Sequence, residues 1–163
     1  MGGGAVSDRD GATRGDGWAL APIRVGEDAD FSARLWNYWR DLGAEPSPVW
    51  HAHYLDRLAA DAGGGRHPLW GLRGEERFGF VVLRLDADWL LPERRIGYVA
   101  EFCVFPPWRR QGCGRRLFEL SRRWLADRGG TGVELDVLPE NRGALAFWQS
   151  LGFTLAYHHL RRP

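Results

Sequence analysis

Two glycines at the start of an expected helix mark the part of the sequence best suited to bind an anion. Gly112 and Gly114 remove Cβ atoms where a backbone would approach a ligand closely. The backbone N–H groups around them lie at a helix N-terminus, which is a ready site for phosphate. The pattern is neither the P-loop GxxxxGK(S/T) nor the dinucleotide fingerprint GxGxxG. A glycine-led helix start with solvated arginines is the alternative interpretation. The flanking arginines are Arg109, Arg110, Arg115 and Arg116.

A single carboxylate interrupts the apolar run at 95–105, which is expected to be a strand. Strand alternation puts Glu101 and Cys103 on one face, with Phe102 and Val104 on the other. Partial burial would raise the pKa of Glu101 toward that of a useful general base. Glu101 is therefore the candidate catalytic residue, and a carboxylate paired with an arginine is the alternative.

These residues depend on strands and helices that the hydrophobic spacing predicts. The expected strands are 18–25, 67–74, 77–85, 95–105, 131–138 and 154–160, and the expected helices are 27–43, 49–65, 114–128 and 141–153. This order implies an α/β (α+β) fold, with a mixed central β-sheet flanked by helices on both faces. Residues 1–16, rich in Gly and Asp, are expected to form a flexible tail, and residues 17–163 a single domain.

The composition of the 163 residues excludes several classes of protein. Hydrophobic residues make up 44% and charged residues 26%, which is typical of a globular chain. No apolar run approaches the roughly 20 residues of a membrane span, and the N-terminus lacks a signal-peptide pattern. The two cysteines, Cys103 and Cys113, exclude a disulfide framework and a Cys-only zinc site. We expect a cytoplasmic protein without a metal site.

Charge is divided unevenly along the chain. Residues 1–91 hold 10 arginines against 14 acidic residues, whereas residues 92–163 hold 12 arginines against 7. The net charge of +1 lies below the basic excess of a typical nucleic-acid-binding protein. The division suggests an anionic ligand near the C-terminal half and a cationic ligand near the N-terminal half. All the cationic side chains other than histidine are arginine, which excludes a lysine Schiff base.

Two stretches carry a resemblance to a known family. The sequence V-x-P-P-x-R-R-Q-G-C-G-R-R-L at 104–117 resembles the acyl-CoA-binding signature of the GNAT N-acetyltransferases, whose core is Arg/Gln-x-x-Gly-x-Gly/Ala. Arg109, Gly112 and Gly114 match that core. The sequence V-L-P-E-N-R-G-A-L-A-F-W-Q-S-L-G-F at 137–153 resembles the strand, Asn-led helix and Leu-Gly-Phe end that follow in the family. The resemblance implies the GNAT fold, with a sheet splayed between its fourth and fifth strands, and acetyl-CoA as the co-substrate.

The resemblance also implies which residues hold acetyl-CoA. The backbone of Phe102, Cys103 and Val104 would pair with the pantetheine arm, and the amides from Arg110 to Arg115 would hold the pyrophosphate. The co-substrate-binding residues implied in this way are Phe102, Cys103, Val104, Arg109, Arg110, Gln111, Gly112, Cys113, Gly114, Arg115, Asn141, Ala144, Phe147 and Trp148.

The chain departs from the family pattern at the thiol end of this site. By resemblance, Asn141 would hydrogen-bond near the pantetheine, and Ala144, Phe147 and Trp148 would flank the thiol. Many family members have a tyrosine at the position of Trp148, which is interpreted as the general acid for the leaving thiolate. An indole N–H donates a hydrogen bond but is no useful acid near neutral pH. Tyr157 could substitute, although a packed strand residue is the simpler interpretation.

The expected function is transfer of the acetyl group of acetyl-CoA to a primary amine of a small molecule. Direct attack is expected, because neither cysteine resembles an acyl carrier. The acidic N-terminal half favours a cationic acceptor, such as a polyamine or an aminoglycoside, beside the aromatic residues at 36–39 and Trp50. The alternatives are a non-catalytic acyl-CoA-binding or sensor domain, and acetylation of a protein N-terminus or an amino acid. We expect no nucleic-acid or membrane partner, and a homodimer stays open.

Overall fold

One β-sheet runs through the molecule, and its strands lie in the order of the sequence. The computed structural model describes residues 17–61, 65–88 and 90–157. Within these residues five strands pair in the order β1-β2-β3-β4-β5. The neighbours are antiparallel except for β4 and β5, which are parallel. The strands are β1 Trp18–Pro22, β2 Arg66–Arg73, β3 Glu76–Ala87, β4 Arg95–Val104 and β5 Gly130–Leu135.

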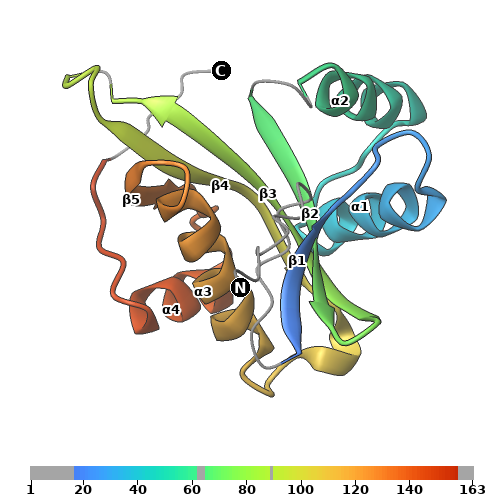
Figure 1. Cartoon of the computed structure of the whole chain (residues 1–163). Helices are drawn as coiled ribbons and strands as arrows, with labels where there is room; N and C mark the ends of the chain where they lie inside the picture. The colour runs from blue at the N-terminus through green and yellow to red at the C-terminus, as the bar shows by residue number, and fades with distance from the viewer. Residues whose placement is uncertain (1–16, 62–64, 89, 158–163) are drawn as a thin grey trace, which may run out of the picture.

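The helices lie on both sides of this sheet (Figure 1). Side-chain caps begin three of them: Asp28 accepts from Phe31 N, Ser47 from Trp50 N and Asn141 from Ala144 N. Such caps satisfy backbone N–H groups that have no acceptor inside the helix. The helices are α1 Ala29–Asp41, α2 Pro48–Ala60, α3 Cys113–Ala126 and α4 Arg142–Ser150, and a short 3₁₀ turn, Pro106–Trp108, follows β4.

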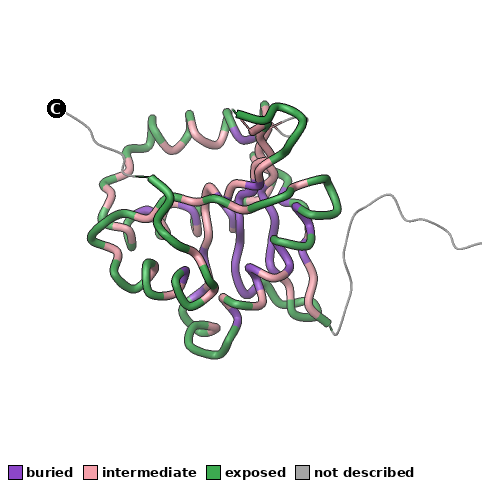
Figure 2. Tube along the Cα trace, turned by 90° about the vertical axis from the view of Figure 1, so that its left-hand side faces the viewer, coloured by how far each residue is buried: buried purple, intermediate pink, exposed green. Residues whose placement is uncertain are grey.

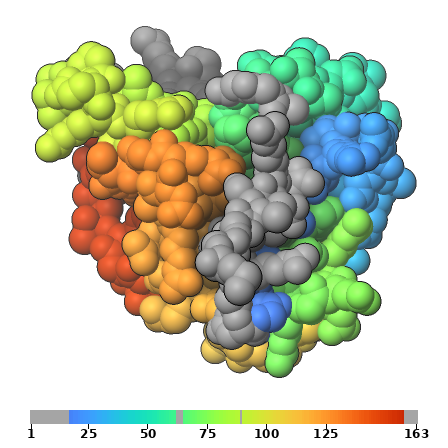
Figure 3. Space-filling model, in the orientation of Figure 1, coloured from blue at the N-terminus to red at the C-terminus, as the bar shows by residue number. Residues whose placement is uncertain are grey.

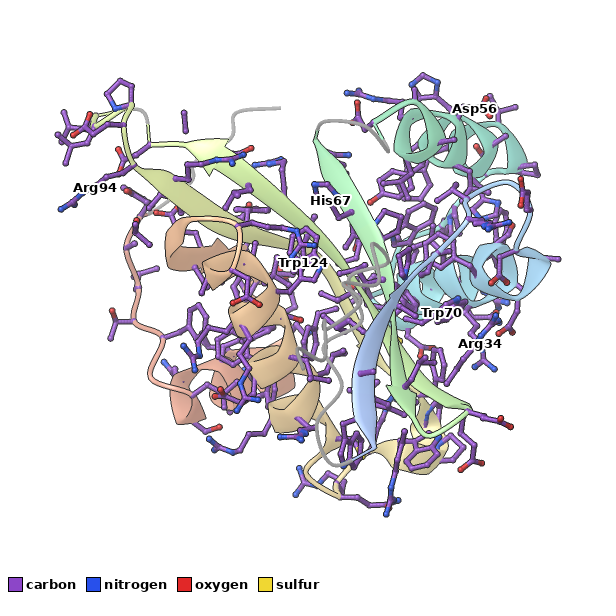
Figure 4. The ribbon with its side chains drawn as sticks, viewed as in Figure 1. Arg34, Asp56, His67, Trp70, Arg94 and Trp124 are labelled. Atoms are coloured by element: carbon purple, nitrogen blue, oxygen red, sulfur yellow. The ribbon has the colours of Figure 1, made fainter. Side chains whose placement is uncertain are left out.

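The two faces of the sheet bury separate apolar cores. On one face α3 presents Leu117, Leu120 and Trp124, which recur at the helical spacing and are all buried. Trp124 also points toward His67 of β2, and the two ring centroids lie 4.8 Å apart (Figure 4). We call this side the α3/α4 face. Figure 3 shows α3 and α4 in orange and red, on the opposite side of the molecule from α1 and α2.

On the other face, α1 buries Phe31, Leu35 and Trp39, which lie four residues apart and so share one side of the helix. The ring of Phe31 meets that of Trp70 on β2 edge-on, with centroids 5.8 Å apart. We call this side the α1/α2 face. Figure 2 shows the buried strands in purple between largely exposed helices, as expected for a sheet covered on both faces.

The predicted fold class is confirmed, with one error at the C-terminal end. The segment expected to be a strand at 154–160 has no strand over 154–157, and residues 158–160 lie outside the described part. Leu155 and Tyr157 are largely exposed, so no apolar burial holds this segment against the sheet. The expected tail at 1–16 also lies outside the described residues, and the division into a tail and a single domain stays a prediction.

A β-bulge in β4 decides which side chains face which core. Val82 of β3 lies opposite Glu101, but the next residue, Leu83, lies opposite Val99, so Ala100 is an extra residue in β4. Strict alternation would put Val99 and Glu101 on the same face. Instead, Val99 packs in the α3/α4 core, whereas Glu101 faces α2.

Candidate active site

The sheet opens between β4 and β5, as the resemblance implies. The parallel pairing of these strands ends at Val99 and Leu135. From Glu101 to Val104, β4 still pairs with β3 but has no β5 partner among the described residues. A strand edge of this kind presents backbone N–H and C=O groups that can hydrogen-bond an extended ligand. The bulge at Ala100 lies where the two strands separate.

A cavity of about 150 Å³ lies at this opening. Five of the residues predicted from the sequence line this cavity together. One comes from β4 and the others from α4 and its N-cap, more than 35 positions further along the chain. They are Phe102, Asn141, Ala144, Phe147 and Trp148. The structure therefore brings together the residues that the resemblance placed around the thiol and the adjoining pantetheine.

The glycine turn leads from the end of β4 into α3. Gly112 has φ of 79°, a left-handed conformation that favours glycine, and Arg110 before it also has a positive φ of 62°. A Cβ at Gly114 would lie 3.1 Å from the ring of Phe147, so a side chain at this position would press against that ring. The first N–H groups of α3, which have no acceptor inside the helix, point out of this turn and are available to an anion.

Several predicted side chains at the turn make hydrogen bonds within the protein instead of extending toward a ligand. Arg109 Nε donates to Val104 O at 2.8 Å, and its Nη2 reaches Asp41 Oδ2 at 3.5 Å. Gln111 Nε2 donates to Pro107 O at 2.6 Å, and Arg115 Nη2 donates to Ser150 O at 3.4 Å. Arg109 thus joins the end of β4 to α1.

Trp148 is buried among aromatic rings at the inner end of the cavity, with 6% of its surface exposed. Its ring centroid lies 4.9 Å from those of Phe102 and Phe147, 5.7 Å from Phe118 and 5.3 Å from Phe153. The arrangements are edge-on, which aromatic pairs prefer. Packing therefore determines the position of the indole on the wall of the cavity.

Neither cysteine side chain reaches this cavity. Cys103 packs in the α1/α2 core, where burial raises the pKa of its thiol to about 11. Cys113 packs in the α3/α4 core with 2% of its surface exposed. A buried thiol with a raised pKa is a weak nucleophile. Direct attack without an acyl group on either cysteine stays a prediction.

Glu101 projects from β4 toward α1 and α2, on the face opposite the aromatic rings. The hydroxyl of Tyr54 on α2 donates to Glu101 Oε1 at 2.8 Å. Burial raises the pKa of Glu101, although hydrogen bonds from Tyr54, Tyr38 and Trp39 and the charge of Arg66 act against this rise. The residues that line the cavity in the described part of the chain do not include Glu101.

Eight further residues line the cavity that were not among the predicted co-substrate-binding residues, and they include Tyr38, Leu42, Asp136 and Leu138. Tyr38 belongs to the aromatic run at 36–39, and its place on the buried side of α1 was the available signal. Asp136 follows β5, and its Oδ2 accepts a hydrogen bond from Tyr98 at 2.5 Å. These residues form the side of the cavity that faces α1 and the end of β5.

A split mixed sheet, with a glycine turn and a helix start beside the split, is the architecture that the resemblance implies. The sequence model of the Acetyltransferase (GNAT) family matches residues 34–153, which is most of the chain. The protein therefore belongs to the GNAT acetyltransferase family, whose members use acetyl-CoA.

Solved structures share this fold at low sequence identity. An aminoglycoside N-acetyltransferase, AAC(6')-Iy in complex with CoA, superposes with a TM-score of 0.70 at 16% identity, covering 93% of this chain and 97% of that one. A transcriptional regulator from Bacillus halodurans C-125 also gives a TM-score of 0.70 at 16% identity, with 90% of this chain and 99% of the other covered. These two proteins have different described roles, so the likeness shows the fold alone.

A curated relative from Methanocaldococcus jannaschii, described as an uncharacterized N-acetyltransferase, is 35% identical over 77 residues. That match covers 46% of this chain, and it spans only about a third (33%) of the relative's length. Among residues 17–61, 65–88 and 90–157, no helix is both long and apolar enough to cross a membrane. The same residues contain no group of three or more His, Cys, Asp or Glu side chains that could hold a metal ion.

Proposed function

We propose that this protein transfers the acetyl group of acetyl-CoA to a primary amine of a small molecule. The observation that carries the proposal is the continuity of the site. The glycine turn at 110–115, the β4 edge from Ala100 to Val104 and the cavity adjoin one another in that order. Acetyl-CoA has an anionic pyrophosphate, an extended pantetheine arm and a thioester, and these three parts would occupy the three environments in this order.

The residues present suit acetyl-CoA. The amides at the start of α3 would hold the pyrophosphate. The edge of β4 at Phe102, Cys103 and Val104 would hydrogen-bond the amide groups of the pantetheine arm, as an added strand does. Because these contacts use backbone groups, the side chains of Cys103 and Cys113 can point into the two cores.

Glu101 is the general base in this proposal. The amine nitrogen attacks the thioester carbonyl carbon, the new C–N bond forms and the C–S bond breaks. Because Glu101 does not line the cavity, it would take one proton from the nitrogen through a bridging water, and the sulfur leaves as a thiolate that must gain a proton. The burial that raises the pKa of Glu101 supports this role, because a stronger base removes an ammonium proton more readily.

We infer that the acceptor is a cationic small molecule. Asp136 lies on the cavity wall and is exposed, so it offers a carboxylate to an ammonium group. The acidic excess of residues 1–91 agrees with such a ligand. One similar solved structure is AAC(6')-Iy with the bisubstrate analog CoA-S-monomethyl-acetylneamine, at a TM-score of 0.67 and 14% identity, covering 90% of this chain and 97% of that one. A cytoplasmic location and a homodimer stay predictions.

The test is thiol release from acetyl-CoA by the purified protein with a panel of amines. The panel contains aminoglycosides, polyamines, amino acids and a peptide with a free N-terminus. Release that depends on a small cationic amine supports the proposal. Binding of acetyl-CoA without release for any amine favours a sensor domain, and release only with the peptide or amino acids moves the acceptor to those classes.

A further inference from the structure

Tyr38 connects the cavity to the carboxylate on the opposite face of β4. Its side chain comes from the buried side of α1 and lines the cavity with Phe102 and Trp148. Its ring meets that of Phe80 edge-on, with centroids 5.5 Å apart, and this packing fixes the direction of the phenol.

The hydroxyl of Tyr38 lies among the polar groups that the proposed reaction uses. The carboxyl group of Glu101 raises the pKa of Tyr38 and the backbone N–H of Phe102 lowers it, so the hydroxyl lies close to both groups. Phe102 belongs to the separated edge of β4. Glu101 itself does not line the cavity. Among the described residues, Tyr38 is the side chain that lines the cavity and also lies close to the carboxyl group of Glu101.

A second tyrosine provides a natural comparison. Tyr54 of α2 donates its hydroxyl proton to the carboxylate of Glu101 at 2.8 Å, but it does not line the cavity in the described part of the chain. Tyr54 is thus hydrogen-bonded to the carboxyl group of Glu101 and Tyr38 lies close to it, but of the two tyrosines Tyr38 is the one that lines the cavity.

We propose that Tyr38 is a further catalytic residue, which relays the proton from Glu101 to the departing thiolate. The inference rests on the proposed function. Glu101 takes a proton from the attacking nitrogen, Tyr38 gives its hydroxyl proton to the sulfur, and Tyr38 recovers a proton from Glu101. The C–N bond forms and the C–S bond breaks, and the products are the amide and the thiol of CoA. Both side chains return to their starting protonation states.

The chemistry of the cavity explains why a relay is needed. The indole of Trp148, which adjoins the same cavity, cannot protonate a thiolate near neutral pH. Burial raises the pKa of Tyr38, and the charge of Glu101 raises it further, so a free tyrosinate is strongly disfavoured. A hydroxyl in this position therefore gives up one proton only while it receives another. Glu101 is placed to supply that proton.

The first measurement uses the protein without acetyl-CoA and does not depend on activity. Carboxyl NMR titration of Glu101 follows its pKa in the wild type, in Tyr38→Phe and in Tyr54→Phe. Each variant removes one hydroxyl donor from the carboxylate, so both are expected to raise the pKa of Glu101. An unchanged pKa in Tyr38→Phe would overturn the relay, because the two groups would then not be coupled.

The second measurement is pre-steady-state thiol release at saturating amine, in H₂O and in D₂O. Tyr38→Phe is expected to slow release by about 10- to 100-fold, which is modest for general acid catalysis because thiolates leave easily. The solvent isotope effect on release should fall at the same time. Tyr54→Phe is the matched control, and it is expected to keep most of the rate and the isotope effect. Calorimetry should show unchanged affinity for acetyl-CoA in both variants.

Full release and an unchanged isotope effect in Tyr38→Phe would overturn the relay and leave the proposed function standing. Equal losses in Tyr38→Phe and Tyr54→Phe would also overturn it, because both would then act only through the basicity of Glu101. A wild-type protein that releases no thiol with any amine would overturn the relay and the proposed function together.

Discussion

The two sides of the opening between β4 and β5 are built on different principles. On the donor side, the glycine turn and the β4 edge present backbone groups, and several nearby side chains are occupied with protein contacts. On the proposed acceptor side, the groups available for chemistry are side chains: the carboxyl groups of Glu101 and Asp136 and the hydroxyl of Tyr38.

This difference explains why the two sides are unequally visible in the sequence. Backbone binding needs glycine where a Cβ would obstruct the ligand or the packing, so it leaves a fixed local pattern of residues. Side-chain chemistry needs only that groups meet in space, and Tyr38 meets Glu101 from 63 positions away in the chain. Substitutions on the donor side should therefore affect binding of acetyl-CoA, whereas those on the acceptor side should affect the chemical step.

The largest effect is expected on the donor side, from Gly112→Glu. The added side chain and its negative charge would occupy the site of the pyrophosphate, so binding of acetyl-CoA should fall below detection by calorimetry. Gly129→Glu is the matched control, because Gly129 has a similar φ of 87° and a Cβ there would also meet no described atom within 4 Å. Unchanged affinity in a folded Gly112→Glu protein would refute the pyrophosphate site.

The second effect belongs to the acceptor side. Glu101→Gln keeps the shape of the side chain and removes the base, so kcat should drop on the order of 10²-fold with little change in acetyl-CoA affinity. In the wild type, kcat/KM should rise with pH as Glu101 loses its proton, at a higher pH than for an ordinary glutamate, and the variant should lose this limb. Glu119→Gln on α3 is the control. Near-wild-type turnover of Glu101→Gln across the pH range would assign Glu101 a structural role.

Substitutions of Trp148 test the role of the cavity wall that lies between the two sides. Trp148→Ala should cost about 3–5 kcal/mol of unfolding free energy, as for other buried tryptophans, measured by urea denaturation. Trp148→Phe should be nearly silent in kcat, because packing is the role that the structure supports. Trp148→Tyr in the Tyr38→Phe background adds a phenol to the same cavity and should partly restore thiol release. A collapse of the chemical step in Trp148→Phe, with binding intact, would show that the indole N–H acts directly.

The smallest effect concerns stability and its dependence on pH. Because the pKa of Glu101 is raised in the folded protein, ionisation of this group disfavours folding. Its contribution to stability is present below the ordinary pKa of a glutamate and is lost as the pH rises through the raised value. Glu101→Gln should therefore gain unfolding free energy relative to the wild type between pH 4 and pH 8. A constant difference across this range would contradict a raised pKa.

Much of the fold could be predicted because its signals are local. The apolar spacing of α3, with Leu117, Leu120 and Trp124 on one side, indicates an amphipathic helix without any knowledge of its partner. The same holds for the runs that became β2, β3 and β4. The expected strand at 154–160 failed over its described part because alternation at Leu155 and Tyr157 resembles a strand, whereas a strand also needs a neighbour.

The sequence by itself determined the family and predicted the proposed donor side, because adjacent residues carry that information. Gly112 and Gly114 lie two positions apart, and the helix start follows at once. Only the tertiary structure decided the acceptor side. The bulge at Ala100 sets the face of Glu101, the end of the β4–β5 pairing opens the cavity, and the packing of α1 brings Tyr38 to it. These relations join residues far apart in the chain, and local spacing carries no information about such distances.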